Sequence, residues 1–259
     1  MSRKPYSWLV VVGMISLCIG LSGCGKNADT VAGSSIPIEP GEHVMYGSYQ
    51  GEPVEWRVLD KKDGEILLLS EYGLDAQPFD TSGKSRVDWK DSTIRKWLND
   101  DFYNSAFSEK EKENIVESKS EGFEEYNTSM NLTGGGKPYA YLEREIEDKV
   151  FLLSNTELCA YFSEDPYPGC YSDPYAHKEL LCYPTAYAKQ QLETRYQTET
   201  CGWWLCNHVY EDDSVELVSA YGQGSGTSRE NIKANTKSIA VRPAMWVTWQ
   251  SDMETIEEE

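Results

Sequence analysis

The sequence predicts an α+β domain of antiparallel sheets with a few short helices and long loops, and three observations lead to this fold class. Apolar and polar residues alternate over 54–60, which is typical of a strand with one buried face. Apolar residues recur at helical spacing over 94–102 and favour a short helix there. Two dense apolar runs, 201–206 and 239–247, are too short to be helices of their own and indicate buried strands.

The first strands are expected to form an antiparallel meander. Val54, Trp56 and Val58 alternate with polar residues in its middle strand. Turns that contain glycine separate this strand from its neighbours at 51–53 and 61–64. Strands are expected at 43–50, 54–60 and 66–69, and further along the chain at 149–153, 203–205, 215–221 and 239–248.

Short helices are predicted from their start signals. The pattern Ser-x-x-Glu, a capping box, occurs at 108–111 and again at 154–157, and Pro184 suits the first turn of a helix. The helices are expected from 91–93 onward, from 108–111 through 115–116, from 154–157 and from 184. Residues 117–146 are expected to form a surface excursion and residues 163–183 an aromatic-rich loop.

The N-terminus carries the pattern of an exported bacterial lipoprotein. A basic start is followed by an uncharged apolar run over 8–21, which is shorter than the roughly 20 residues that span a bilayer. The tetrapeptide Leu-Ser-Gly-Cys at 21–24 resembles a lipobox, in which the cysteine is diacylated and becomes the first residue of the mature chain. We therefore expect a signal peptide over 1–23, a lipid on Cys24, and anchoring at the extracellular face of the cell membrane. The alternative is a plain signal peptide with an accidental cysteine.

Composition predicts the rest of the domain organisation. Residues 24–40 are mostly small and polar, and we expect a flexible tether with a mean span of about 20–25 Å. A single globular domain is expected over 41–250 and a solvated acidic tail over 251–259. The formal net charge of −19 becomes about −21 without residues 1–23, which hold two basic and no acidic residues. Such a surface repels phosphates, so nucleic-acid binding is excluded.

A series of motifs in a fixed order carries a family resemblance. The motifs are Trp56-Arg57-Val58-Leu59, Leu68-Leu69-Ser70-Glu71, Ser92-Thr93-Ile94-Arg95-Lys96-Trp97-Leu98-Asn99, Asp148-Lys149-Val150-Phe151-Leu152-Leu153-Ser154, Pro184-Thr185-Ala186-Tyr187-Ala188, Trp203-Trp204-Leu205 and Val241-Arg242-Pro243-Ala244-Met245-Trp246. Together they resemble an uncharacterised extracellular domain family of Gram-positive bacterial surface proteins, over about residues 43–248. The family usually has Trp-Trp-Leu-Arg followed by Ser, whereas this chain has Cys206 and Asn207 there.

That family pattern is in turn similar to C-type-lectin-like domains of the kind found in formylglycine-generating enzymes. The resemblance implies a fold whose first and last strands pair, which would place 56–59 beside 244–247. The calcium-dependent sugar motif of true C-type lectins is absent from the sequence, so a calcium cofactor has no support. No Ser-His-Asp order stands out, and no cofactor is expected apart from the lipid on Cys24.

Aromatic side chains and one arginine are the candidate ligand-binding residues. They are Trp203, Trp204, Tyr161, Tyr167, Tyr171, Tyr187 and Arg242. The two tryptophans could stack on a sugar or peptide, but large aromatic residues on short strands are more often part of the core. Arg242 could clamp a carboxylate, and a structural ion pair is the favoured alternative.

Seven cysteines include Cys18 in the signal peptide and Cys24 at the lipid site. The remaining candidates for disulfides or metal binding are Cys159, Cys170, Cys182, Cys201 and Cys206. Disulfides are expected outside the cell, but the sequence does not give their connectivity. The spacing matches none of the usual zinc patterns, so no metal site is predicted. Cys201 and Cys206 have the interval of the copper(I) cysteines in formylglycine-generating enzymes but in a different register, so oxidase activity is not expected.

The leading hypothesis is a membrane-anchored extracellular lipoprotein that displays a non-catalytic lectin-like domain. Its ligand would be a glycan, a cell-wall fragment or a peptide, bound near the aromatic loop 161–187 and the Trp203–Trp204 pair. The alternative is a structural or assembly module for a protein partner, and a copper-dependent oxidase is the least favoured function.

Overall fold

The computed structural model describes residues 36–84, 87–118, 147–162, 178–193, 198–208, 215–223 and 234–256. The chain divides into two compact units, Met1–Ser34 and Ser35–Glu259, and all described residues belong to the second unit. The predicted signal peptide, Cys24 and most of the tether lie outside the described residues. Within the described residues, no helix has the length and apolarity that crossing a membrane requires.

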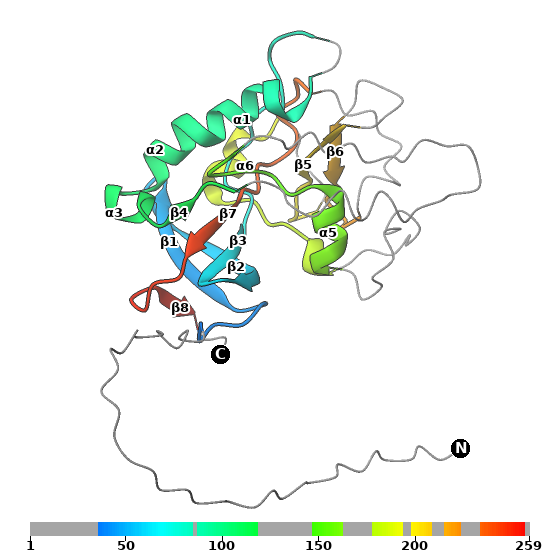
Figure 1. The fold of residues 1–259 in the computed structure, drawn as a ribbon. Coiled ribbons are helices and arrows are strands. Elements are labelled where there is room, and N and C mark those ends of the chain that lie inside the picture. The colour runs from blue at the N-terminus through cyan, green and yellow to red at the C-terminus, as the bar shows by residue number, and fades with distance from the viewer. Residues whose placement is uncertain are drawn as a thin grey trace, which may run out of the picture. The chain divides into compact units, whose positions relative to one another are not determined.

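The predicted meander of three strands is confirmed. It consists of β1 (His43–Tyr49), β2 (Glu52–Lys62) and β3 (Glu65–Ser70), paired antiparallel in this order (Figure 1). Tyr49 pairs with Glu52 across a two-residue turn whose members, Gln50 and Gly51, have φ angles of 54° and 89°. Turns with positive φ at both central positions match the twist of the flanking strands, so this turn fixes the register of the hairpin.

The meander is the centre of a six-stranded sheet with the order β4-β7-β3-β2-β1-β8. Its outer strands are β4 (Ile115–Val116), β7 (Ala244–Thr248) and β8 (Glu254–Ile256). The expected pairing of 56–59 with 244–247 is wrong, because β3 lies between them and pairs with β7 from Leu69↔Ala244 to Glu65↔Thr248. Residues 66–69 of β3 are at most 1% exposed, and a strand buried in this way needs a partner on each side.

The end of the expected tether and part of the expected acidic tail belong to the folded domain. Residues 254–256 of the expected solvated tail form β8, which pairs with β1 from His43↔Ile256 to Met45↔Glu254. Ile38, from the end of the expected tether, is 2% exposed, and the Lys61 Nζ lies 3.2 Å from its carbonyl oxygen. The folded domain therefore begins a few residues earlier and ends a few residues later than composition suggests.

The helical stripe over 94–102 is confirmed. Successive helical turns α1 (Thr93–Trp97), η2 (Leu98–Phe102) and α2 (Tyr103–Ala106) carry Ile94, Leu98 and Phe102 into the core. The Ser92 side chain accepts a hydrogen bond from the Arg95 N–H and thereby caps the first turn. The middle turn is a π-helix, and the short 3₁₀ turn η1 (Trp89–Asp91) precedes the whole segment.

Both capping boxes are confirmed. Ser108 opens α3 (Glu109–Lys112), with Glu111 bonding back to it, and Ser154 with Glu157 opens α5 (Asn155–Phe162). The helix from Ser108 is shorter than predicted, because 115–116 pair with β7 as β4. In α6 (Ala186–Gln191) the N-cap is Thr185, so Pro184 lies one residue before the cap; the 3₁₀ turn η4 (Lys178–Leu180) lies upstream.

A second sheet of two strands, β5 (Trp203–His208) and β6 (Val215–Val218), completes the described fold. The expected strand over 149–153 is a buried connecting segment with one bridge, Phe151↔Ala244, and the N–H of Cys206 donates to the Leu153 carbonyl at 3.0 Å. Residues 239–243 also form a buried connecting segment, with the isolated bridges Asp75↔Val241 and Trp203↔Ala240. The regular strand in the predicted run 239–248 begins only after Pro243, as β7. These segments join the two sheets through one continuous core.

Buried polar groups join α5 to the second sheet. Asn155 donates its backbone N–H to Asn207 Oδ1 at 2.8 Å and its side-chain amide to Glu216 Oε2 at 2.9 Å. Asn207 therefore helps to position the start of α5. Burial raises the pKa of Glu216 to about 7, although the Asn155 hydrogen bond opposes that shift.

Gly47 is expected to tolerate no side chain. Its φ is +69°, and a Cβ there would lie 2.6 Å from the Ala106 carbonyl oxygen and 2.7 Å from the Phe107 ring. Gly47→Ala should lower the free energy of unfolding by about 2–4 kcal/mol, from backbone strain plus overpacking. Gly51→Ala is the matched control, since Gly51 also has positive φ but no atom within 4 Å of such a Cβ, and should cost about 1 kcal/mol. Chemical denaturation of both variants measures the difference, and equal losses would contradict it.

Glu216 should make the protein less stable as the pH rises. The unfolded carboxyl titrates near 4.5 and the folded one near 7, so between these values the unfolded state loses its proton first and gains in relative stability. Against Glu216→Gln, the wild type should lose up to about 3 kcal/mol between pH 4.5 and 8. Urea unfolding of both proteins over this range measures the effect, and parallel pH profiles would rule it out.

Candidate functional site

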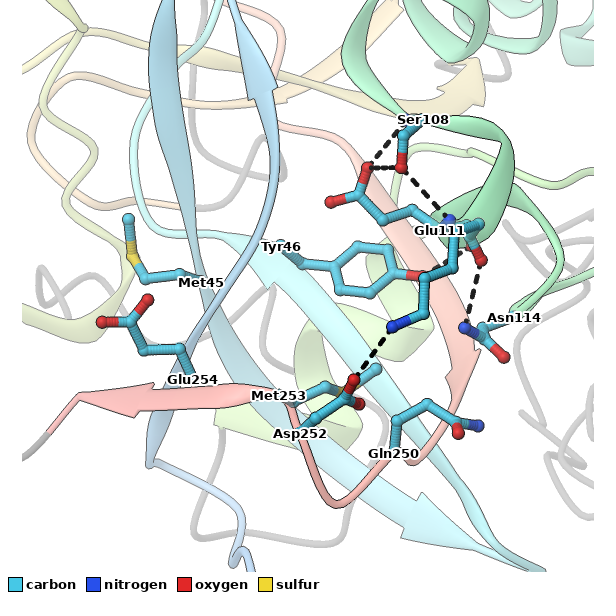
Figure 2. A pocket seen from close by; sticks show the side chains of 10 residues that line it. Met45, Tyr46, Ser108, Glu111, Asn114, Gln250, Asp252, Met253 and Glu254 are labelled. Atoms are coloured by element: carbon cyan, nitrogen blue, oxygen red, sulfur yellow. Dashed lines mark hydrogen bonds and ion pairs between the residues drawn. The ribbon is translucent and has the colours of Figure 1, made fainter.

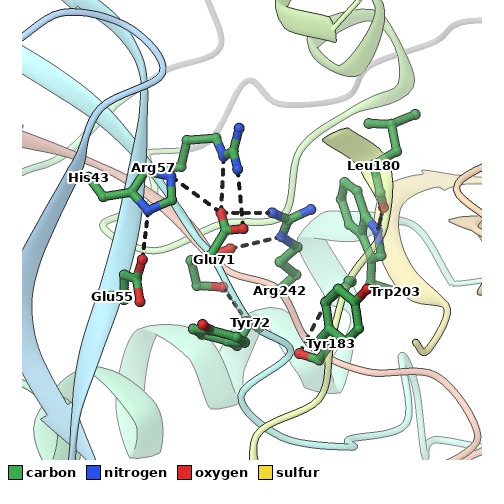
Figure 3. A network of polar contacts seen from close by, with 11 residues as sticks. His43, Glu55, Arg57, Glu71, Tyr72, Leu180, Tyr183, Trp203 and Arg242 are labelled. Carbon is green, nitrogen blue, oxygen red and sulfur yellow. Dashed lines mark hydrogen bonds and ion pairs between the residues drawn. The ribbon is translucent and has the colours of Figure 1, made fainter. Parts of the chain in front are cut away.

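A cluster of charged side chains lies on one face of the meander (Figure 3). We call it the Glu71 network; its members are His43, Glu55, Arg57, Glu71 and Arg242. The Arg57 guanidinium makes two contacts with the Glu71 carboxylate, Nε to Oε2 at 3.0 Å and Nη2 to Oε1 at 3.2 Å. His43 Nδ1 lies 2.6 Å from Glu55 Oε1, and its Nε2 lies 3.8 Å from Glu71 Oε2. Glu71 thus lies at the centre of the network, in contact with two guanidinium groups and close to the His43 imidazole.

The strand pairing explains why these groups meet. His43 and Arg57 lie directly opposite each other in β1 and β2, and Glu55 is two residues from Arg57 on the same face of β2. Glu71 follows β3 directly, and its N–H donates to the Glu55 carbonyl at 2.9 Å. The positions of the carboxylates are therefore fixed by the sheet backbone.

Arg242 is the buried member of the network, with no exposed surface. Its Nε donates to the Ser70 carbonyl at 2.8 Å, and Nη2 lies 3.6 Å from Glu71 Oε2. The guanidinium also lies over the Trp203 ring, 5.0 Å from its centre. The predicted alternative of a structural ion pair is confirmed, and burial keeps this arginine from contacting a ligand at the surface.

Two exposed tyrosines flank the Glu71 network. Tyr72 is 39% exposed and Tyr183 is 47% exposed, and the N–H of Gly73 donates to the Tyr183 carbonyl at 3.0 Å, which holds their backbones side by side. Burial, together with the carboxylates of Glu55 and Glu71, raises the pKa of Tyr72. We call the two rings, together with Glu55, Arg57 and Glu71, the Tyr72–Tyr183 patch.

The patch combines flat aromatic surface with fixed polar groups. Side-chain exposure is 23% for Glu55, 22% for Arg57 and 21% for Glu71, so part of each charged group faces solvent. Carboxylates accept hydrogen bonds and the guanidinium donates them, while tyrosine offers both an apolar face and a hydroxyl. Such a surface can bind a molecule that has apolar faces and several hydroxyl or amide groups.

The predicted tryptophans lie elsewhere. Trp203 and Trp204 have no exposed surface, and their indole N–H groups donate to the Leu180 and Gln77 carbonyls at 3.0 Å each. Because both rings are enclosed and both donors are satisfied, they contribute to the core. The core alternative is therefore confirmed for both residues.

The predicted tyrosines are only partly placed. Tyr161 is half-buried against the core, and half-buried Tyr187 packs edge-on against Tyr49 with ring centres 5.9 Å apart. Tyr167 and Tyr171 lie outside the described residues. Sequence reasoning missed Tyr72, although the polar residues that alternate along β2 marked the face on which it lies.

The cysteines are separated into different environments. Cys182 and Cys201 form an isolated antiparallel bridge, whereas the Cys206 thiol lies 4.0 Å from Asn207 Oδ1. Cys170 and the side chain of Cys159 lie outside the described part of the structure. Among the described side chains, no three His, Cys, Asp or Glu residues are grouped so that they could hold a metal ion.

A separate hollow of about 290 Å³ lies between β1, α3 and the C-terminal segment (Figure 2). Tyr46 donates its hydroxyl to the Glu111 carbonyl at 2.6 Å, and the Glu111 carboxylate accepts the Gly47 N–H at 3.0 Å. Lys110 Nζ pairs with Asp252 at 3.0 Å at the rim. These contacts join three elements of the fold around the hollow.

The comparisons with known proteins give one match. Residues 63–249 match a family model described as a domain of unknown function, DUF6273. No curated protein matches the chain, and no solved structure does. The family match covers most of the folded unit, including Glu71, Tyr72, Tyr183 and Arg242. This chain belongs to the DUF6273 family.

Proposed function

We propose that this chain is a lipid-anchored extracellular lipoprotein whose domain, of a C-type-lectin-like type, binds a glycan or a cell-wall glycan fragment without converting it. The observation that carries the proposal is the Tyr72–Tyr183 patch, where two exposed aromatic rings adjoin a fixed set of carboxylates and a guanidinium. Aromatic rings can cover the apolar faces of a sugar, while ionised groups hydrogen-bond its hydroxyls.

The rigidity of the patch also favours binding. Strand pairing sets the positions of the Glu55 and Glu71 carboxylates. The bidentate contact between Arg57 and Glu71 also fixes the orientation of these two side chains. A site with pre-set polar groups loses little conformational freedom when a ligand arrives. The large apolar side chains exposed in the described residues are three tyrosines, which suits a polar ligand with flat faces better than a broad apolar protein interface.

Substituting the patch tyrosines should weaken binding. The full exported chain, purified in detergent, is screened against an array of glycans and peptidoglycan fragments, and the best ligand is titrated by calorimetry. Tyr72→Ala and Tyr183→Ala should each raise the Kd about tenfold, because each removes roughly 1.4 kcal/mol of ring contact. Tyr221→Ala is the matched control, since Tyr221 is also exposed, at 59%, but follows β6 and should leave the Kd unchanged.

Other results of this screen would point elsewhere. Unchanged affinity in both patch variants would move the site away from Tyr72 and Tyr183. Binding to peptides but to no glycan would overturn the ligand class. If nothing binds at high micromolar concentration, the assembly role becomes the better hypothesis.

Anchoring should depend on Cys24. Cys24→Ala should shift the protein from the membrane fraction to the soluble fraction, because the proposed lipid is attached to this thiol. Mass spectrometry of the mature N-terminal peptide should show a diacylglyceryl group on Cys24. Cys18→Ala, within the predicted signal peptide, is the control and should leave the protein in the membrane fraction. An unlipidated mature N-terminus would exclude the anchor.

A further inference from the structure

We infer that Cys182 and Cys201 are joined by a disulfide bond in the exported protein. This crosslink goes beyond the proposed ligand binding and depends only on export into an oxidising compartment. Both thiols are fully buried, and they lie in neighbouring segments of the core that precede α6 and β5.

The backbone places the two residues at disulfide distance. They form an antiparallel bridge in which the Cys201 N–H donates to the Cys182 carbonyl at 2.8 Å. Directly opposed residues of a hydrogen-bonded antiparallel pair have Cα atoms about 5.5 Å apart, within the range of about 4.4–6.8 Å that disulfides use. A bridge of this kind therefore brings the two Cα atoms into the range of separation that a disulfide requires.

The sulfur atoms also point into the same space. Cys201 Sγ lies 3.5 Å from the Cys182 carbonyl oxygen. The two sulfurs lie at equal distances of 3.4 Å from the point that a Cβ on Gly73 would occupy. Since Gly73 has no side chain, both sulfurs, which belong to free thiols in this structure, can pack over its backbone.

The electrostatic surroundings favour one thiolate in the pair. Burial opposes ionisation of Cys182, but the hydrogen bond with Cys201 and the nearby Arg242 guanidinium lower its pKa. The hydrogen bond to Cys182 and burial both raise the pKa of Cys201. In the folded domain Cys182 is therefore the more acidic thiol of the pair.

The oxidant is a thiol–disulfide oxidoreductase, or another disulfide, outside the membrane. The thiolate of one of the two cysteines attacks one sulfur of that disulfide, a mixed disulfide forms, and one thiolate of the oxidant leaves. The thiolate of the other cysteine then attacks the protein sulfur of the mixed disulfide and releases the second thiolate. Two electrons and two protons pass to the oxidant, which becomes a dithiol. Because both sulfurs are enclosed in the folded domain, this exchange takes place before the domain closes.

The bond would close a loop of about 20 residues that contains α6, and a closed loop restricts the unfolded chain. Tyr183 follows Cys182 directly, so the crosslink also anchors one side of the Tyr72–Tyr183 patch.

Peptide mapping of the full exported chain tests the pairing. Cells are lysed in denaturant with an alkylating reagent that blocks thiols, and the protein is digested without reduction. Mass spectrometry should find the peptides that contain Cys182 and Cys201 joined, about 2 Da lighter than their sum, and separated by reduction. The control Cys206→Ala should retain this linked pair. Alkyl groups on both cysteines without reduction, or a bond from either one to Cys159, Cys170 or Cys206, would overturn the proposal.

Thermal unfolding provides a second readout that a packing role would not produce. A reductant should lower the midpoint of the wild type by about 5–10 °C. Cys182→Ala, Cys201→Ala and the double variant should all lose their response to the reductant, because breaking either end breaks the bond, whereas Cys206→Ala should keep it. If wild-type protein that has been reduced in denaturant and refolded has the same midpoint as untreated protein, the crosslink is contradicted. This comparison holds even if the cysteine variants fail to fold. Neither measurement uses a glycan, so a result against the disulfide would not count against the proposed ligand binding.

Discussion

The buried ion pair between Arg242 and Glu71 is the interaction on which the arrangement of the domain depends. A guanidinium without exposed surface loses its hydration, which costs several kcal/mol unless the protein supplies partners. The partners here are the Glu71 carboxylate at 3.6 Å, the Ser70 carbonyl at 2.8 Å and the face of Trp203. They come from the end of β3 and from β5, while Arg242 itself precedes β7. Both sheets must therefore be correctly placed before these three contacts can form.

The same carboxylate connects the core to the surface. Glu71 binds the buried Arg242 on one side and the partly buried Arg57 on the other, so its orientation is set from within the domain. Tyr72 follows Glu71 in the chain, and its ring is placed by the same backbone that positions the ion pair. Internal packing thus fixes surface groups, as a site that binds a ligand without rearranging requires.

The parts of the fold that the sequence could predict are those set by local interactions. The meander follows from alternation around Val54, Trp56 and Val58, and both capping boxes involve residues three positions apart. The pairing of β7 with β3 instead of β2 is a long-range choice, and the motifs that end at Leu59, Glu71 and Trp246 carry no signal that orders the strands. The local pattern also predicted a strand at 149–153, where the structure has a connecting segment. A buried apolar run can serve as a connection when its hydrogen bonds go to two different partners.

The candidate site was hidden from sequence reasoning for a related reason. The sequence identified aromatic residues as candidates, but exposure decides which of them can contact a ligand, and exposure depends on the whole fold. Trp203 is enclosed because its ring covers the Arg242 guanidinium, whereas Tyr72 stays at the surface beside Glu71. The motifs that carry the family resemblance contain the residues of the ion-pair frame, namely Arg57, Ser70, Glu71, Trp203 and Arg242. Tyr72 and Tyr183 lie just outside those motifs, so in this architecture the exposed rings can change while the frame that holds them is kept.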